Sequence, residues 1–131
     1  MPEAIRDDMA GEDATKTERW LPQRDLDAYV QEWQHTGFQG ALNWYRCMTD
    51  PDKQKDVLLF AGTKIQCPLI FISGENDWGN YQEPNVLQKM SKACADYRGE
   101  KMVKHAGHWP QQEQPEQVVD FIQEFLHSLN A

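Results

Sequence analysis

The most informative stretch of this chain for its fold is CPLIFISGEND, residues 67–77. Pro68 precedes four consecutive apolar residues, Leu69 to Ile72, which show no alternation between apolar and polar positions. A continuous apolar run of this length is typical of a strand buried on both faces of a parallel sheet. The polar residues that follow, Gly74 to Asp77, predict a loop at the carboxyl end of that strand.

The segments on the C-terminal side continue an α/β pattern. Apolar residues at helical spacing from Val86 to Cys94 predict a helix that ends before Gly99, and residues 101–104 predict a short strand. A last helix begins at Pro115, and we expect its apolar face to pack on the sheet. That face comprises Val118, Val119, Ile122, Phe125, Leu126 and Leu129. The order strand, helix, strand, helix predicts a parallel α/β sheet flanked by helices.

The N-terminal side is helical. Apolar spacing predicts an amphipathic helix over 23–36, a second over 39–48 and a third whose apolar end, 57–60, is closed by Gly62. Residues 1–19 are polar and charged without periodicity, so we expect a loosely ordered arm there. The predicted organisation is thus an arm over 1–19, a helical part over 20–61 and an α/β part over 62–131.

Composition restricts the classes of partner. The 131 residues carry 13 Lys and Arg against 21 Asp and Glu, a net charge of -8, which disfavours nucleic acid and anionic membranes. The apolar runs are far shorter than the roughly 20 residues of a membrane span. Cys47, Cys67 and Cys94 form no CxxC pair, so we expect reduced, buried thiols. With no apolar stretch near Met1 to suggest a signal peptide, we expect a cytoplasmic protein.

Two loops carry the residues that could do chemistry. Asp77 follows the first predicted strand, and His108 follows the second in the segment His105-Ala106-Gly107-His108-Trp109. Neighbouring strands lie about 5 Å apart, so this carboxylate can reach this imidazole. Such a contact orients the ring and stabilises the imidazolium that forms when the other nitrogen takes a proton.

Simpler roles exist for the same residues. An Asp in a glycine-rich loop is commonly a turn or cap residue, and His108 could be a packed histidine in a tight turn. The spacing His105-x-x-His108 is too short a signal for a metal site. We expect neither a metal nor a cofactor.

The residues Ser73 to Asp77, followed by a helix, a strand, Gly107-His108-Trp109 and a C-terminal amphipathic helix, resemble the end of an α/β-hydrolase fold. The segment GFQGALNWYR, residues 37–46, is similar to the cap of epoxide hydrolases, with haloalkane and haloacid dehalogenases as relatives. The resemblance implies the end of a helical cap and a return helix over 20–61, then the C-terminal portion of the hydrolase core.

The resemblance also implies roles for individual residues. Asp77 would be the triad acid, His108 the base, and Tyr45 the donor of a hydrogen bond to the epoxide oxygen, with the acid–base pair facing a cavity beneath Tyr45. Further, it implies that Trp44, Trp78 and Trp109 bind substrate, a small hydrophobic epoxide. A simpler role for Tyr45 is packing against Trp44, since aromatic residues at helical spacing are more often core.

One family feature is missing from the sequence. We find no nucleophile elbow: the serines and cysteines lack glycines on both sides, and Asp77 has Gly79 after it but Glu75 and Asn76 before it. We therefore expect the chain to carry the acid–base pair without the nucleophile, and to need a complementing N-terminal part. The alternative is a non-catalytic remnant or partner subunit that binds, or self-associates, through an exposed sheet edge.

Overall fold

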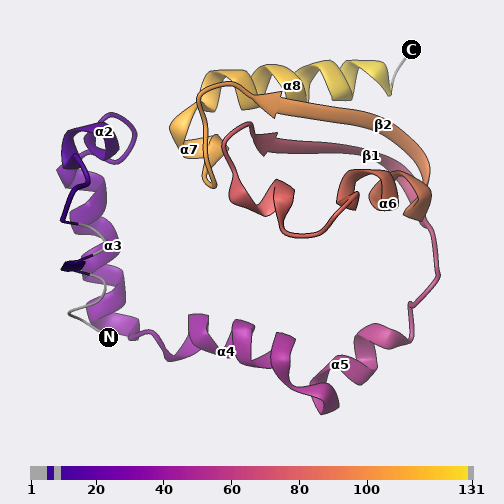
Figure 1. Cartoon of the computed structure of the whole chain (residues 1–131), viewed down its shortest axis with the longest axis horizontal. Helices are drawn as coiled ribbons and strands as arrows, with labels where there is room; N and C mark the ends of the chain where they lie inside the picture. The colour runs from indigo at the N-terminus through magenta and orange to yellow at the C-terminus, as the bar shows by residue number, and fades with distance from the viewer. Residues whose placement is uncertain (1–5, 8–9, 130–131) are drawn as a thin grey trace.

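The computed structural model describes residues 6–7 and 10–129, and a helical part precedes a small sheet in it (Figure 1). The first helices are α2 (Ala14–Glu18), α3 (Gln23–Thr36), α4 (Gln39–Thr49) and α5 (Pro51–Leu58). The second part contains β1 (Ile65–Gly74), η1 (Trp78–Tyr81), α6 (Val86–Ala93), β2 (Cys94–Val103), α7 (Pro110–Glu113) and α8 (Pro115–Ser128). Residues 1–5 and 8–9 of the predicted arm lie outside the described residues.

Local sequence signals set the helix boundaries. Helix α3 has the predicted bounds and ends at Gly37, whose φ of 67° is in the left-handed region that favours glycine. Helix α5 starts where the Asp50 side chain accepts the N–H of Asp52, with Pro51 in the first turn. The three predicted helices of this part are confirmed to within a few residues.

The sheet consists of β1 and β2, which pair in parallel and are joined by α6. Leu69 pairs with Tyr97, and Ser73 pairs with Met102. The prediction for β2 was too short, because the strand starts at Cys94 and includes Gly99. Strand β2 is longer than predicted because it pairs along the whole of β1, including residues whose sequence pattern does not favour a strand. Strand formation depends on such pairing as well as on the local sequence.

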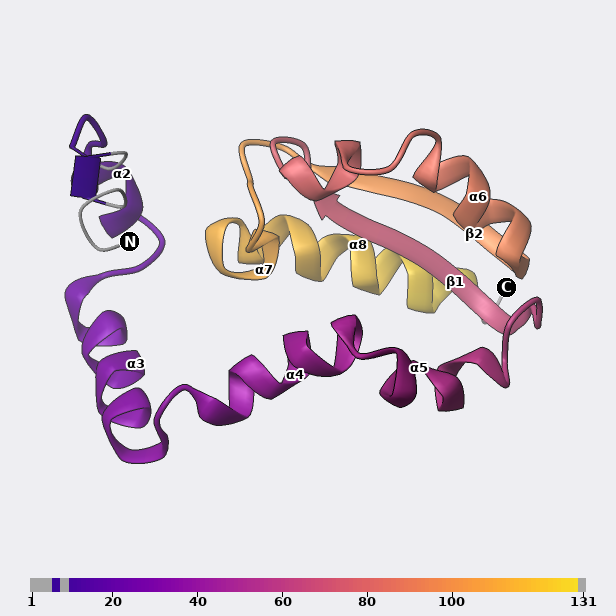
Figure 2. The ribbon, with the colours of Figure 1, turned by 60° about the horizontal axis from the view of Figure 1, so that its bottom comes forward.

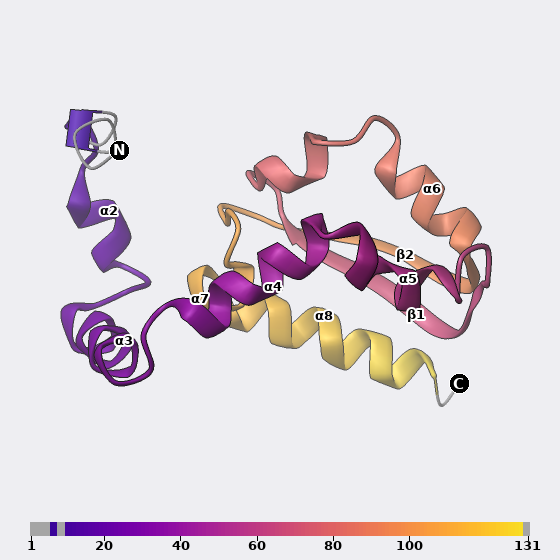
Figure 3. The same cartoon turned by 90° about the horizontal axis from the view of Figure 1, so that it is seen from below.

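Helices cover the two faces of this sheet, α6 on one and α8 on the other (Figures 2 and 3). Among the described residues, the buried apolar side chains are Cys94, Val103 and Ala106. Leu69 to Ile72 are only half-buried, so the prediction of burial on both faces was wrong. One helix on each face of a two-stranded sheet is too narrow to cover these side chains completely.

The packing of α8 is likewise partial. Its contacts with β1 and β2 confirm that the helix lies on the sheet. However, Val119, Ile122, Leu126 and Leu129 of its apolar face are 42 to 51% exposed. The accessible surface of the structure is 10881 Å², whereas a compact monomer of 15.2 kDa exposes about 7,100 Å². Apolar surface therefore stays accessible on this chain.

The helical part adds to that surface. Helices α4 and α5 contact each other and run below the sheet, apart from it, in Figure 1. Cys47 and Cys67 are exposed and only Cys94 is buried, so the expectation of buried thiols was wrong for two of the three cysteines. Cys47 is exposed because no layer covers α4 in the described part of the chain, and Cys67 is exposed because it precedes the covered part of β1. No helix in the described ranges is long and apolar enough to cross a membrane.

Candidate active site

The two loops at the carboxyl ends of β1 and β2 touch through their backbones. Past Gly74, the N–H of Glu75 donates to the carbonyl of Val103 at 3.0 Å, and that of Asn76 donates to the carbonyl of Ala106 at 3.0 Å. A Cβ atom on Gly74 would lie 2.1 Å from the carbonyl oxygen of Gly107. Only glycine allows this approach, which brings the residue after Gly107 to the loop of Asp77.

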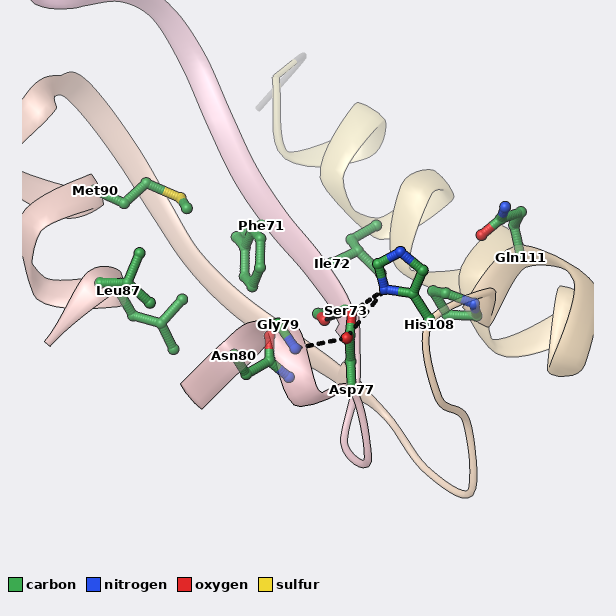
Figure 4. Close-up of a pocket in the computed structure, with 12 residues that line it drawn as sticks. Phe71, Ile72, Ser73, Asp77, Gly79, Asn80, Leu87, Met90, His108 and Gln111 are labelled. Atoms are coloured by element: carbon green, nitrogen blue, oxygen red, sulfur yellow. Dashed lines mark hydrogen bonds and ion pairs between the residues drawn. The ribbon is translucent and has the colours of Figure 1, made fainter. Parts of the chain in front are cut away.

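Asp77 is the centre of a hydrogen-bond cluster (Figure 4). Its Oδ1 accepts the N–H of Gly79 at 2.8 Å, and Nδ1 of His108 lies 3.1 Å from Oδ1 and 3.2 Å from Oδ2. The Ser73 hydroxyl donates to Oδ2 at 3.4 Å. Burial raises the pKa of the Asp77 carboxyl, but the bonds from Gly79 and His108 outweigh it and lower that pKa below the ordinary value of 3.8. Asp77 is therefore a buried carboxylate at neutral pH.

His108 is held so that one ring nitrogen is available. Because a carboxylate only accepts hydrogen bonds, the contact with Asp77 assigns the ring proton to Nδ1. Nε2 makes no hydrogen bond with any described residue. The ring stacks on Trp78, with centroids 5.7 Å apart, and meets the edge of Trp109 at 5.3 Å. With 51% of the side chain exposed, His108 can take a proton from a water molecule.

The pair opens onto a cavity of about 400 Å³ between β1, η1 and α6. In Figure 4 the apolar side chains of Phe71, Leu87 and Met90 lie on one side of the cavity, and His108 and Gln111 lie on the other. The cavity thus has apolar walls and a single acid–base pair, the usual makeup of a small-molecule site. The complete lining is Phe71, Ile72, Ser73, Asp77, Gly79, Asn80, Val86, Leu87, Met90, His108, Pro110 and Gln111.

The predicted site residues of the helical part lie elsewhere. Tyr45 and Trp44 belong to α4, are 65 and 72% exposed, and do not line this cavity. The expectation of one cavity beneath Tyr45 is therefore wrong for this structure, in which α4 packs on α5 and not over the strand ends. Trp78 and Trp109 flank His108 without lining the cavity.

Two other acids, Glu75 in the first loop and Asp96 near the start of β2, are engaged elsewhere. Glu75 accepts the N–H of His105 at 2.7 Å, and Asp96 pairs with Arg98 at 2.6 Å. In the described part of the chain, no group of three His, Cys, Asp or Glu side chains could hold a metal ion. Asp77 is thus the carboxylate that contacts His108.

The sequence interpretation missed Glu113, which accepts the N–H groups of Gly107 and Trp109 on either side of His108. A signal was present. Pro110 marks the first turn of a helix, and an acidic residue in that turn can reach back to the preceding N–H groups, as in a capping box. The close approach at Gly74 had no comparable signal, because it depends on a residue far along the chain.

Comparisons with known proteins point to one group of enzymes, although no family model matches the chain. Epoxide hydrolase B of Mycobacterium tuberculosis is 33% identical over 110 residues, which are 84% of this chain and 30% of that protein. Epoxide hydrolase I of potato (Solanum tuberosum) superposes with a TM-score of 0.77 at 25% identity, over 89% of this chain and 37% of that one. Epoxide hydrolase A of Mycobacterium thermoresistibile superposes with a TM-score of 0.69 at 33% identity, over 82 and 33%.

The chain spans about a third of the length of these relatives. Its fold is the C-terminal portion of an α/β-hydrolase fold, in which helices precede a strand-helix-strand-helix unit. Within that class the chain is epoxide-hydrolase-like.

Proposed function

We propose that this chain supplies the acid–base pair of an epoxide-hydrolase-like reaction. The observation that carries the proposal is the contact of Asp77 with Nδ1 of His108 at the end of an apolar cavity. The names of the relatives add the substrate class, an epoxide, and the apolar walls of the cavity favour a small hydrophobic one. In this reaction a carboxylate nucleophile opens the epoxide to a covalent ester, and water then hydrolyses the ester to a diol.

The chain's own residues act in the second step. Nε2 of His108 takes a proton from water as the oxygen attacks the ester carbonyl, and the imidazolium is stabilised by the Asp77 carboxylate at 3.1 Å. Trp78 and Trp109 hold the ring from two sides, and their proposed role in binding substrate applies to a substrate that extends beyond the cavity, which they do not line. The nucleophile comes from a complementing segment, because no residue here stands in an elbow sequence.

Tyr45 keeps its proposed role as hydrogen-bond donor to the epoxide oxygen. That role requires α4 to lie over the strand ends in the catalytic arrangement, whereas Tyr45 is exposed here. We accordingly propose that 20–61 is the end of a cap with its return helix, that 62–131 is a core segment, and that 1–19 is an arm. The free cysteines favour the cytoplasm as the compartment.

The test mixes the purified chain with the part of Mycobacterium tuberculosis epoxide hydrolase B that lies outside the matching region. We expect hydrolysis of styrene oxide by the mixture and none by the chain alone. His108→Gln should lower the rate by about 100-fold or more, the usual size of a general-base effect. His105→Gln is the matched control, since this histidine belongs to the same loop and its side chain is 84% exposed.

Two results would contradict the proposal. Turnover by the chain alone that disappears in His108→Gln would show that the nucleophile is within this chain. Turnover by the mixture that is the same in His108→Gln and His105→Gln would remove His108 from the reaction.

A second candidate function is association through the sheet edge. Each strand of the described sheet has one strand neighbour, so each presents one edge with unpaired backbone groups. A partner subunit, or a second copy of the chain, could add a strand there. Turnover separates the two candidates, because this function needs a stable complex and no acid–base chemistry. Gel filtration would then show a complex that is unaffected by His108→Gln, and the mixture would hydrolyse no styrene oxide.

A further inference from the structure

Glu113 binds the backbone on both sides of His108. Its Oε2 accepts the N–H of Gly107 at 2.7 Å, and its Oε1 accepts the N–H of Trp109 at 2.9 Å. Both hydrogen bonds are accepted by a carboxyl group, and hydrogen bonds to an ionised carboxylate are stronger than those between neutral groups. One carboxylate thus holds the backbone N–H groups of the residues before and after His108.

The rest of this loop is fastened by other side chains. The N–H of Lys104 donates to Gln117 at 3.1 Å, and the amide of Gln117 donates back to the carbonyl of Lys104 at 3.2 Å. The N–H of His105 donates to Glu75 at 2.7 Å. These contacts hold the start of the loop, at the end of β2. The N–H groups of the residues on either side of His108 are held by Glu113.

We propose that Glu113 is the positioning residue of His108. By holding the backbone on both sides of His108, Glu113 sets the position and orientation of the imidazole relative to Asp77. The inference rests on the proposed function, because it assigns Glu113 to the acid–base pair of that reaction. Glu113 does not line the cavity and takes no proton from substrate or water. It acts through the backbone, and an acid–base pair needs this support because its geometry must be held to about 0.5 Å.

A simpler role for Glu113 is to cap α7, whose first residue follows Trp109. A cap explains the bond from Trp109, and its loss lowers the stability of the chain. It does not explain the bond from Gly107, which lies before the helix on the other side of His108. The two roles differ in what happens to the imidazole when the carboxylate is removed.

The experiment measures the tautomer of His108 in the full chain from the ¹⁵N chemical shifts of its ring at neutral pH, assigned with His108→Gln. In the wild type we expect the proton on Nδ1. In Glu113→Ala the ratio of Nδ1–H to Nε2–H should fall about tenfold, the equivalent of one charge-assisted hydrogen bond. Glu113→Gln should fall between them, because its amide oxygen can accept one N–H but its NH₂ group cannot accept the other.

Two controls accompany these variants. Glu116→Gln removes the same charge from an exposed position three residues away. Gln117→Ala removes the two hydrogen bonds between Gln117 and the backbone of Lys104 at the start of the loop. Both should keep the wild-type tautomer. If Glu113→Ala does not fold, Glu113→Gln decides the question.

A lower melting temperature with an unchanged tautomer in the Glu113 variants would overturn the proposal and leave Glu113 as a cap. The same tautomer change in Glu116→Gln would overturn it as well, since the effect would then come from charge alone. Failure of the proposed function is recognised separately, as absent turnover in the mixing experiment, because the tautomer measurement requires no turnover.

Discussion

The backbone of Gly74 lies against that of Gly107 so closely that a Cβ atom on Gly74 would be 2.1 Å from the Gly107 carbonyl oxygen. This contact joins the loop of Asp77 to the loop of His108. The obstructing atoms are backbone, so they cannot move aside as a flexible side chain would.

Gly74→Ala should therefore displace the His108 loop and lower the free energy of unfolding by about 1–3 kcal/mol or more, as overpacking does. Urea unfolding followed by tryptophan fluorescence measures this change. Gly40→Ala is the control, because a Cβ there meets no atom within 4 Å and alanine favours helix α4. Equal stability of Gly74→Ala and wild type would contradict the close contact.

Asp77→Asn should destabilise the chain in a pH-dependent way. The folded state lowers the pKa of Asp77 below 3.8, so its carboxylate contributes stability above that pH, and this stability is lost as pH falls through the lower, folded-state pKa. We expect a cost of about 1.5–3 kcal/mol at neutral pH, from hydrogen bonds to a charged group. Urea midpoints from neutral to acid pH should show the difference from wild type shrinking with acidity.

Asp120→Asn removes the same charge from an exposed position of α8 and is the matched control. Its midpoint should follow the wild type within about 0.5 kcal/mol. A deficit in Asp77→Asn that persists unchanged into acid would show that the carboxylate is not stabilised by His108 and Gly79.

Tyr97 should titrate late. Burial, with the Glu100 carboxylate that accepts its O–H at 3.1 Å, raises the pKa of Tyr97 to about 12. A raised folded-state pKa means that the neutral phenol adds stability below the ordinary value of 10.0, which is lost as pH rises through about 12. Ultraviolet titration should show one late tyrosinate step that Tyr97→Phe removes and Tyr81→Phe retains. No late step in the wild type would contradict the packing of β2.

The isolated chain should be marginally stable and self-associating. Apolar side chains at the end of α5, among them Leu59 at 79% and Phe60 at 71% exposed, add to the half-covered sheet. We expect binding of a hydrophobic dye, weak near-ultraviolet circular dichroism from the five tryptophans, and elution ahead of a monomer. The double variant Leu59→Gln/Phe60→Gln should elute later than the wild type. A single monomeric species with one cooperative unfolding transition would contradict this expectation.

Elements whose signals are local could be predicted from the sequence alone. Apolar spacing, a stopping glycine and Pro115 predicted α3 and α8, and the apolar run Leu69 to Ile72 predicted β1. The parallel pairing of two strands followed from the order of elements, and it put Asp77 within reach of His108. These features depend on neighbours in the chain or on a general rule of sheet topology, so a single sequence contains them.

The remaining features depend on tertiary contacts. The start of β2 at Cys94 follows from pairing with β1, the requirement for glycine at Gly74 follows from the position of Gly107, and the role of Glu113 follows from the path of the loop around His108. Each depends on where a distant backbone lies, which residue spacing does not encode. Burial is decided in the same way: an apolar side chain becomes core only where another element covers it, and in this chain much of the apolar surface stays exposed.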